Sequence, residues 1–179
     1  KYYPRKNVTA ASIIQSIDTS PKIFKKISRW FFGVNNQGQY LVKSGDKLLD
    51  VGCGSGGSLL EAKSLGAEAY GIEADPNVAR LAKELGLQIH QGSIFDNPFP
   101  GKFFDLIIMN QVIEHIPEPD VMLAFLADRL TPAGRLILVF PNIDSIWRCI
   151  FRGSWINWHV PYHQHHFNKR TMKTLVGRC

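Results

Sequence analysis

From residue 46 onward, short apolar runs alternate with segments of about ten residues that have helical spacing. The apolar runs have the length of single strands and lie at 47–51, 68–73, 87–92, 103–110 and 134–141. Helical segments separate several of them, at 56–65, 76–85 and 119–130. Strands that alternate with helices predict βαβ units and a mostly parallel sheet with helices on both faces. We therefore expect an α/β, Rossmann-like, doubly wound fold of three layers, with ligands bound beyond the carboxyl ends of the strands.

The pattern divides the 179 residues into three parts. Residues 1–45 form an N-terminal arm with an amphipathic helix, and residues 46–142 form the cofactor-binding core. Residues 143–179 form a substrate-side segment rich in Trp and His, followed by the start of a late helix. No apolar run approaches the ~20 residues that a membrane-spanning helix needs. Three widely spaced cysteines, Cys53, Cys149 and Cys179, predict free thiols and a cytoplasmic location.

The net charge of +6 favours anionic partners, although a solvated basic surface is the simpler interpretation. The segment SPKIFKKISRWFF (20–32) predicts a basic amphipathic helix that packs on its own domain or lies on a membrane surface. Peripheral membrane contact therefore stays open as an alternative. No recognised nucleic-acid module is present, so nucleic acid is not an expected partner. The oligomeric state is not indicated.

The stretch LLDVGCGSGG (48–57) places a glycine-rich turn directly after the first predicted strand. The spacing of Gly52, Gly54 and Gly57 fits the dinucleotide fingerprint, which would favour NAD. However, Asp50 stands two residues before the first glycine, where a carboxylate would repel a pyrophosphate. A carboxylate there suits a cationic ligand, and S-adenosylmethionine carries an α-ammonium and a sulfonium but no phosphate. The loop therefore favours S-adenosylmethionine as the cofactor.

The sequence LLDVGCGSGG resembles the cofactor loop of class I S-adenosylmethionine-dependent methyltransferases. Three further blocks resemble the same family in the same order: YGIEADPNVARLAKE, FDLIIMNQVIEHIPEP and LTPAGRLILVFPN. The resemblance implies that Glu73, 21 positions after Gly52, binds both ribose hydroxyls of the cofactor. The cofactor-binding residues that it implies are Asp50, Gly52, Cys53, Gly54, Gly56, Glu73, Ala74, Ser93, Ile94 and Asn110. Taken singly, the glycines, Asp50 and Glu73 are also explained by a tight turn, a helix cap and a solvated strand end.

One position departs from the family pattern, at the end of the third predicted strand. Relatives often have an aspartate there that contacts the adenine amino group, whereas this chain has Ser93. We expect backbone groups around Ser93 and Ile94 to hold the adenine, with Ile94 packed on the ring. Asp96, three residues further on, is an alternative partner.

His115 is the candidate catalytic residue. It lies in the loop after the fourth predicted strand, and an imidazole accepts a proton near neutral pH. A hydroxyl acceptor benefits from such a general base. The alternative is that Glu114 and His115 merely shape this loop.

The segment 144–167 contains the candidate acceptor-binding residues Trp155, Tyr162, His163 and His166. Its four histidines, within residues 159–166, raise the possibility of a metal, but no cysteine lies among them and their spacing matches no zinc pattern, so no metal is expected. Its aromatic and basic residues fit a core, a wall for a sugar or lipid-linked acceptor, or a base-stacking surface. We favour a small-molecule or lipid-linked saccharide acceptor, methylated on oxygen.

Two other functions remain to be separated from this one. An NAD-dependent oxidoreductase shares the glycine spacing, and Asp50 argues against it. A non-catalytic module would keep the fold and bind the cofactor without turnover. The resemblance also implies two more strands after the late helix, and the sequence ends at Cys179 before either. We therefore expect a sheet that lacks its last edge strands.

Overall fold

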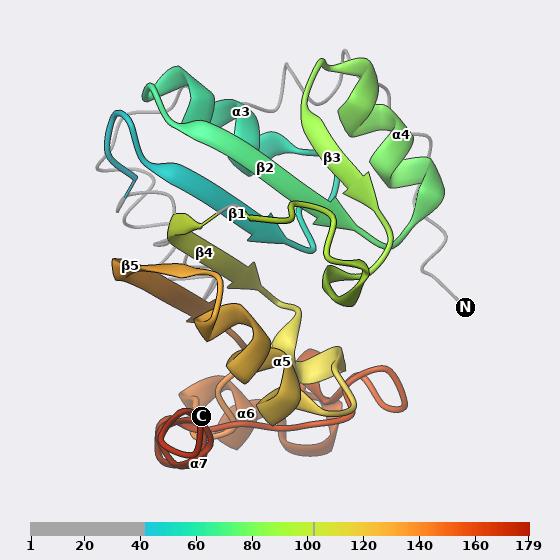
Figure 1. Ribbon diagram of the computed structural model, residues 1–179. Helices are drawn as coiled ribbons and strands as arrows, with labels where there is room; N and C mark the ends of the chain where they lie inside the picture. The colour runs from blue at the N-terminus through green and yellow to red at the C-terminus, as the bar shows by residue number, and fades with distance from the viewer. Residues whose placement is uncertain (1–41, 102) are drawn as a thin grey trace.

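The computed structural model describes residues 42–101 and 103–179, so the predicted arm and the helix at 20–32 lie outside the described residues. The described part contains one sheet of five strands, in the order β3-β2-β1-β4-β5, and all neighbouring strands are parallel (Figure 1). The strands are β1 (Lys47–Val51), β2 (Glu68–Glu73), β3 (Gln88–Gln91), β4 (Phe104–Asn110) and β5 (Leu130–Val139). The predicted open, parallel α/β sheet is confirmed.

Helices connect the strands as the alternating pattern predicts. They are α3 (Gly57–Ser64), α4 (Pro76–Glu84), α5 (Pro119–Ala127), α6 (Ile146–Phe151) and α7 (Lys169–Val176). Short 3₁₀ helices lie at Ile94–Asp96, Ile113–His115, Arg152–Ser154 and Ile156–Trp158. Local signals start the longer helices: the Asp75 side chain accepts from two backbone N–H groups of α4, and Asn168 caps α7. In the described part, no helix has both the length and the apolar character needed to cross a membrane.

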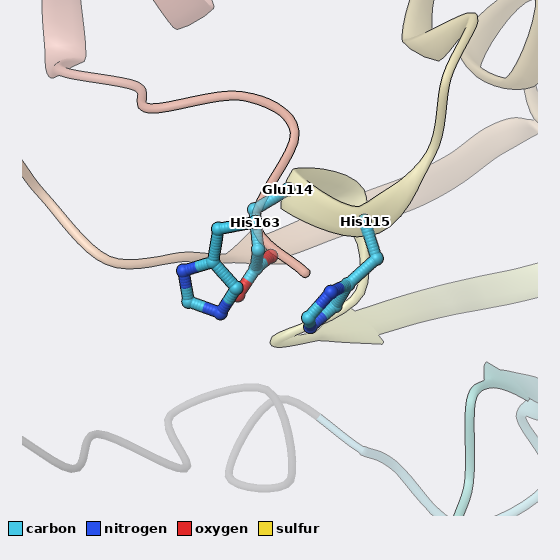
Figure 2. A group of neighbouring side chains, drawn as sticks. All are labelled: Glu114, His115 and His163. Carbon is cyan, nitrogen blue, oxygen red and sulfur yellow. The ribbon is translucent and has the colours of Figure 1, made fainter. Parts of the chain in front are cut away.

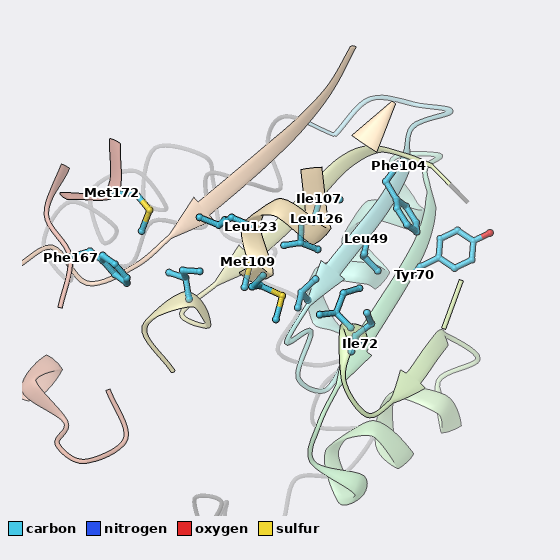
Figure 3. Packing of buried hydrophobic residues seen from close by; sticks show 14 residues of the cluster. Leu49, Tyr70, Ile72, Phe104, Ile107, Met109, Leu123, Leu126, Phe167 and Met172 are labelled. Carbon is cyan, nitrogen blue, oxygen red and sulfur yellow. The ribbon is translucent and has the colours of Figure 1, made fainter. Parts of the chain in front are cut away.

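Two hydrophobic clusters cover the two faces of the sheet. Successive residues of β1 point to opposite faces, so Leu48 joins one cluster and Leu49 the other. The first cluster packs β-strand residues against α3 and α4. The second packs the other face against α5 and α7 and includes Tyr70, Ile107 and Phe167 (Figure 3). The three predicted layers follow from this division.

The connection from α5 to β5 differs from the sequence expectation. The predicted helix 119–130 ends at Ala127, and the strand predicted to start at residue 134 starts at Leu130. Leu130 pairs with Phe104, and after a shift in register Arg135 pairs with Leu106. The turn signal TPAG therefore lies inside the strand as an irregularity, where the Thr131 hydroxyl donates to the Asp105 carboxylate at 3.1 Å.

The strand order creates a switch point between β1 and β4. The chain runs outward from β1 through β2 to β3, then returns to place β4 on the other side of β1. In doubly wound sheets, the crevice that binds ligands lies at such a switch point, at the carboxyl ends of the strands. The glycine loop and the loop with Glu114 and His115 lie at this place.

Candidate cofactor and acceptor site

The glycine loop requires glycine at three alternating positions. Gly52, Gly54 and Gly56 all have positive φ angles, of 77°, 58° and 86°. A Cβ on Gly52 would collide with the Val112 side chain, and a Cβ on Gly56 would collide with that of Leu87. The fourth glycine, at position 57, has open space where its Cβ would stand. The conformationally required pattern is therefore Gly-x-Gly-x-Gly, not the dinucleotide spacing that the sequence also fits.

Asp50 is the buried carboxylate of this site. Its side chain lies in β1 immediately before the turn, is 4% exposed and accepts a hydrogen bond from the Ser58 hydroxyl. Burial raises the pKa of Asp50 to about 7, and the nearby Glu73 charge adds to the effect. Within residues 42–101 and 103–179, no Lys or Arg forms an ion pair with this carboxylate. A cationic ligand group beside Asp50 would lower this pKa again and favour the ionised carboxylate.

Glu73 ends β2, next to the glycine loop. Its Oε2 accepts from the Gly54 backbone N–H at 2.8 Å, and its Oε1 accepts from that of Asp75 at 2.9 Å. Each carboxylate oxygen keeps a second lone pair. The carboxylate is therefore held in a fixed orientation with capacity for two further donors, such as a pair of hydroxyls.

Cys53 is a structural part of the loop. Its thiol is buried, and burial raises its pKa well above the usual range. A Cβ on Gly71 would stand 2.6 Å from Cys53 Sγ, so the glycine in β2 leaves room for the sulfur. The other predicted residue near this edge, Ala74, is exposed between β2 and α4.

Hydrogen bonds of Ser93 and Asp96 shape the turn that follows β3. The Ser93 hydroxyl accepts from the Phe95 backbone N–H, and Asp96 Oδ2 accepts from that of Ser93 at 2.7 Å. The same Asp96 oxygen pairs with His90 Nε2 at 2.8 Å. Ile94 is buried in the core cluster. The alternative adenine partner, Asp96, is thus already engaged with its own turn.

The loop after β4 contacts the glycine loop directly. Asn110 is the last residue of β4, and Gln111 follows it with a left-handed φ of 57°. Val112 then packs against Gly52. This contact brings the 3₁₀ helix Ile113–His115 beside the cofactor loop.

Glu114, His115 and His163 gather at this point (Figure 2). Glu114 is 1% exposed, and neither of its carboxylate oxygens has a hydrogen-bond partner in the described part of the chain. One ligand atom from each of the three residues lies within 4.8 Å of the other two. Burial raises the pKa of Glu114 and lowers that of His163. The burial of Glu114 could not be predicted from the sequence, because it depends on contacts with the distant segment around His163.

Backbone contacts fix the substrate-side segment to this cluster. The backbone N–H groups of Gln164 and His165 donate to the Glu114 carbonyl at 2.9 and 3.1 Å. A parallel bridge between Asn142 and Phe167 joins the two ends of the segment. The segment 143–166 is therefore a closed excursion that returns to the edge of the sheet.

The predicted acceptor residues lie at different depths of this segment. Tyr162 is exposed, whereas Trp155 is buried, 5% exposed, with its ring edge-on to Trp158. His166 is half-buried and its Nε2 donates to the Trp158 carbonyl at 3.0 Å. The structure brings His163, but not His166, next to His115, with ring centroids 4.7 Å apart. Contact of these residues with an acceptor stays a prediction.

The fold and the Gly-x-Gly-x-Gly loop define the class of protein: this is the class I S-adenosylmethionine-dependent methyltransferase fold. Comparison with known families agrees, since residues 17–178 match the methyltransferase domain family, and the chain belongs to it. Among solved structures, a methyltransferase from Archaeoglobus fulgidus has a TM-score of 0.65 at 20% identity, covering 89% of this chain and 68% of that one. The plantazolicin methyltransferase BpumL, solved with S-adenosylhomocysteine and a substrate analogue, has a TM-score of 0.67 at 19% identity, covering 94% and 72%.

Similar curated proteins act on different acceptors. The ubiquinone biosynthesis O-methyltransferase of Cereibacter sphaeroides is 34% identical over 134 residues, covering 70% of this chain and 54% of that protein. The ribosomal protein L11 methyltransferase of Ralstonia pickettii is 37% identical over 100 residues, covering 54% and 33%. The chain thus spans about half or less of these relatives. The shared part fixes the family and leaves the acceptor open.

Proposed function

We propose that the chain transfers a methyl group from S-adenosylmethionine to an oxygen of a small-molecule or lipid-linked saccharide acceptor. The observation that carries the proposal is the buried Asp50 carboxylate beside a Gly-x-Gly-x-Gly turn, without a cationic partner among the described residues. A buried carboxylate at this place stabilises a ligand ammonium and opposes a pyrophosphate.

The residues present fit S-adenosylmethionine. In the proposed complex, the Asp50 carboxylate would pair with the α-ammonium group, and the two Glu73 oxygens, already oriented by the backbone, would accept from the ribose hydroxyls. The positive φ angles of Gly52 and Gly54 let the backbone turn sharply directly after β1, beside Asp50. When bound, the cofactor supplies an activated methyl group on a sulfonium, so the chain's main tasks are to align the acceptor and exclude water.

We assign to His115 the role of accepting the proton of the acceptor hydroxyl. Its Nδ1 lies 2.9 Å from the carbonyl oxygen of Tyr162, which only accepts, so Nδ1 carries the hydrogen. The lone pair of the neutral ring is then on Nε2. Oxygen as the acceptor atom is supported by relatives named as O-methyltransferases, including a probable tocopherol O-methyltransferase of rice, 36% identical over 106 residues and covering 54% of this chain and 29% of that protein.

Thermal unfolding with separate cofactors tests the proposal. S-adenosylmethionine and S-adenosylhomocysteine should raise the melting temperature, and NAD should not. A shift with NAD alone would contradict the methyltransferase assignment. Transfer of a labelled methyl group to a panel of hydroxylated acceptors then separates an enzyme from a non-catalytic module, which would bind the cofactor without turnover.

A further inference from the structure

Two histidines of the cluster at the crevice are oriented in the same way. His115 Nδ1 lies 2.9 Å from the Tyr162 carbonyl, and His163 Nδ1 lies 2.8 Å from the Asn157 carbonyl. A carbonyl accepts only, so both rings carry their hydrogen on Nδ1. Both therefore present the unprotonated Nε2, and a backbone carbonyl behind a ring is the usual outer support of a metal-bound histidine.

Two neighbouring histidines have the opposite orientation. His165 donates Nε2–H to the Pro117 carbonyl at 3.2 Å, and His166 donates Nε2–H to the Trp158 carbonyl at 3.0 Å. Their Nε2 atoms are thus occupied by protein. This difference separates the pair His115 and His163 from His165 and His166.

The third member of the cluster is a carboxylate without a protein partner. Glu114 is almost fully buried, and among residues 42–101 and 103–179 neither of its oxygens finds a hydrogen-bond partner. A buried polar group left unpaired is costly and uncommon in folded proteins. Figure 2 shows this carboxylate between the two imidazole rings. A cation bound there would satisfy it.

We propose that Glu114, His115 and His163 bind one divalent first-row transition metal ion. Two imidazoles and one carboxylate are ligands that zinc, iron and manganese accept. Ligand atoms about 2.0–2.2 Å from a zinc ion lie about 3.4 Å apart in a tetrahedral site. In the structure, one ligand atom from each of the three residues lies within 4.8 Å of the other two, so binding of the ion would draw the side chains closer together.

Three protein ligands leave one coordination position open, as in catalytic zinc sites. In the metal-bound protein Nε2 of His115 would be a ligand and could not accept a proton. The ion would instead lower the pKa of a bound acceptor hydroxyl, which would lose its proton to water before it attacks the methyl group. This extension rests on the proposed function. Binding of the ion itself does not rest on the proposed function, because all three ligands are protein side chains, from the loops that follow β4 and β5, and neither cofactor nor acceptor is needed.

Calorimetric titration of the metal-free chain with Zn²⁺, without cofactor or acceptor, tests the site. One ion should bind per chain, and Glu114→Gln and His163→Gln should each weaken binding by at least about tenfold. His165→Gln is the matched control, since it removes a neighbouring imidazole whose Nε2 is already occupied, and its affinity should equal that of the parent chain.

Binding of Co²⁺ provides a second measurement, which reports the metal ligands directly even in a variant that is less stable than the parent chain. The visible spectrum of bound Co²⁺ reports nitrogen and oxygen ligands in a site of low coordination number, and it should be lost in His163→Gln. Far-UV circular dichroism identifies variants that do not fold. If the parent chain binds no ion, or if the Glu114 and His163 variants bind it as tightly as the control, the proposal is wrong. Zinc binding without methyl transfer would overturn the proposed function and leave the metal site standing.

Discussion

The backbone N–H of Gly54 donates a hydrogen bond of 2.8 Å to Oε2 of Glu73. The glycine loop and the end of β2 are thus joined through the side chain that is proposed to bind ribose. Any change to this carboxylate therefore alters both a ligand contact and the shape of the loop.

Glu73→Gln should weaken S-adenosylmethionine binding by at least about tenfold, because a charge-assisted hydrogen bond contributes roughly 1.5–3 kcal/mol. The amide also turns one N–H₂ group toward the backbone donors of Gly54 or Asp75. Isothermal titration of the variant checks this. The matched control is Glu84→Gln, which removes an exposed carboxylate paired only with Arg80. Equal affinity of Glu73→Gln and the parent chain would show that the ribose assignment is wrong.

Cofactor affinity should rise with pH below neutrality because of Asp50. Its pKa of about 7 means that the carboxyl is largely protonated at pH 6 in the free protein. Binding of an ammonium requires the ionised form, so affinity should increase between pH 5.5 and pH 7.5, by up to about tenfold per pH unit at the acidic end. Asp50→Asn should bind weakly and lose this dependence, which titrations across this range would measure.

The same carboxyl makes the ligand-free protein less stable as pH rises. The folded-state pKa of Asp50 is above its ordinary value of 3.8, so the native chain binds more protons than the unfolded chain between about pH 4 and pH 7. The Asp50 contribution to the free energy of unfolding therefore falls across this window. Chemical denaturation at several pH values should show that the free energy of unfolding falls less steeply with pH in Asp50→Asn than in the parent chain. The same pH dependence in both proteins would show that Asp50 does not titrate with a raised pKa in the folded state.

Gly56→Ala should destabilise the fold by about 1–3 kcal/mol, because the position has a positive φ and a Cβ there collides with Leu87. Gly57→Ala is the matched control. Gly57 is the first residue of α3, and nothing lies within 4 Å of the place where its Cβ would stand. Alanine there should leave the free energy of unfolding unchanged or raise it by up to about 1 kcal/mol. Denaturation curves of the two single variants decide between the two glycine patterns, since the dinucleotide spacing would make Gly57 the sensitive position.

Phe167→Ala should cost about 3–5 kcal/mol of unfolding free energy. Phe167 is buried beside Phe140 and forms the bridge to Asn142. Phe151→Ala removes the same side chain from an exposed position and should change stability by less than about 0.5 kcal/mol. Similar losses in both variants would mean that Phe167 does not anchor the segment.

Local patterns predicted the sheet and the cofactor edge, because strand runs, capping residues and the spacing of Asp50 and Glu73 are all properties of short stretches. The same patterns misplaced the start of β5, where pairing of Leu130 with Phe104 overrides a turn signal. They also could not choose between Gly56 and Gly57, since that choice depends on Leu87. The juxtaposition of Glu114 with His163 depends on the tertiary return of a distant segment, for which no local signal exists.

The bridge between Asn142 and Phe167 has a consequence for diversification of this fold. Because the two ends of the excursion 143–166 meet at the sheet, its interior can change in length and composition while β5 and α7 keep their places. The segment 143–166 can therefore vary between proteins that share the same sheet and glycine loop. Exchanging this segment between relatives would test whether it determines the acceptor, as the proposed function requires.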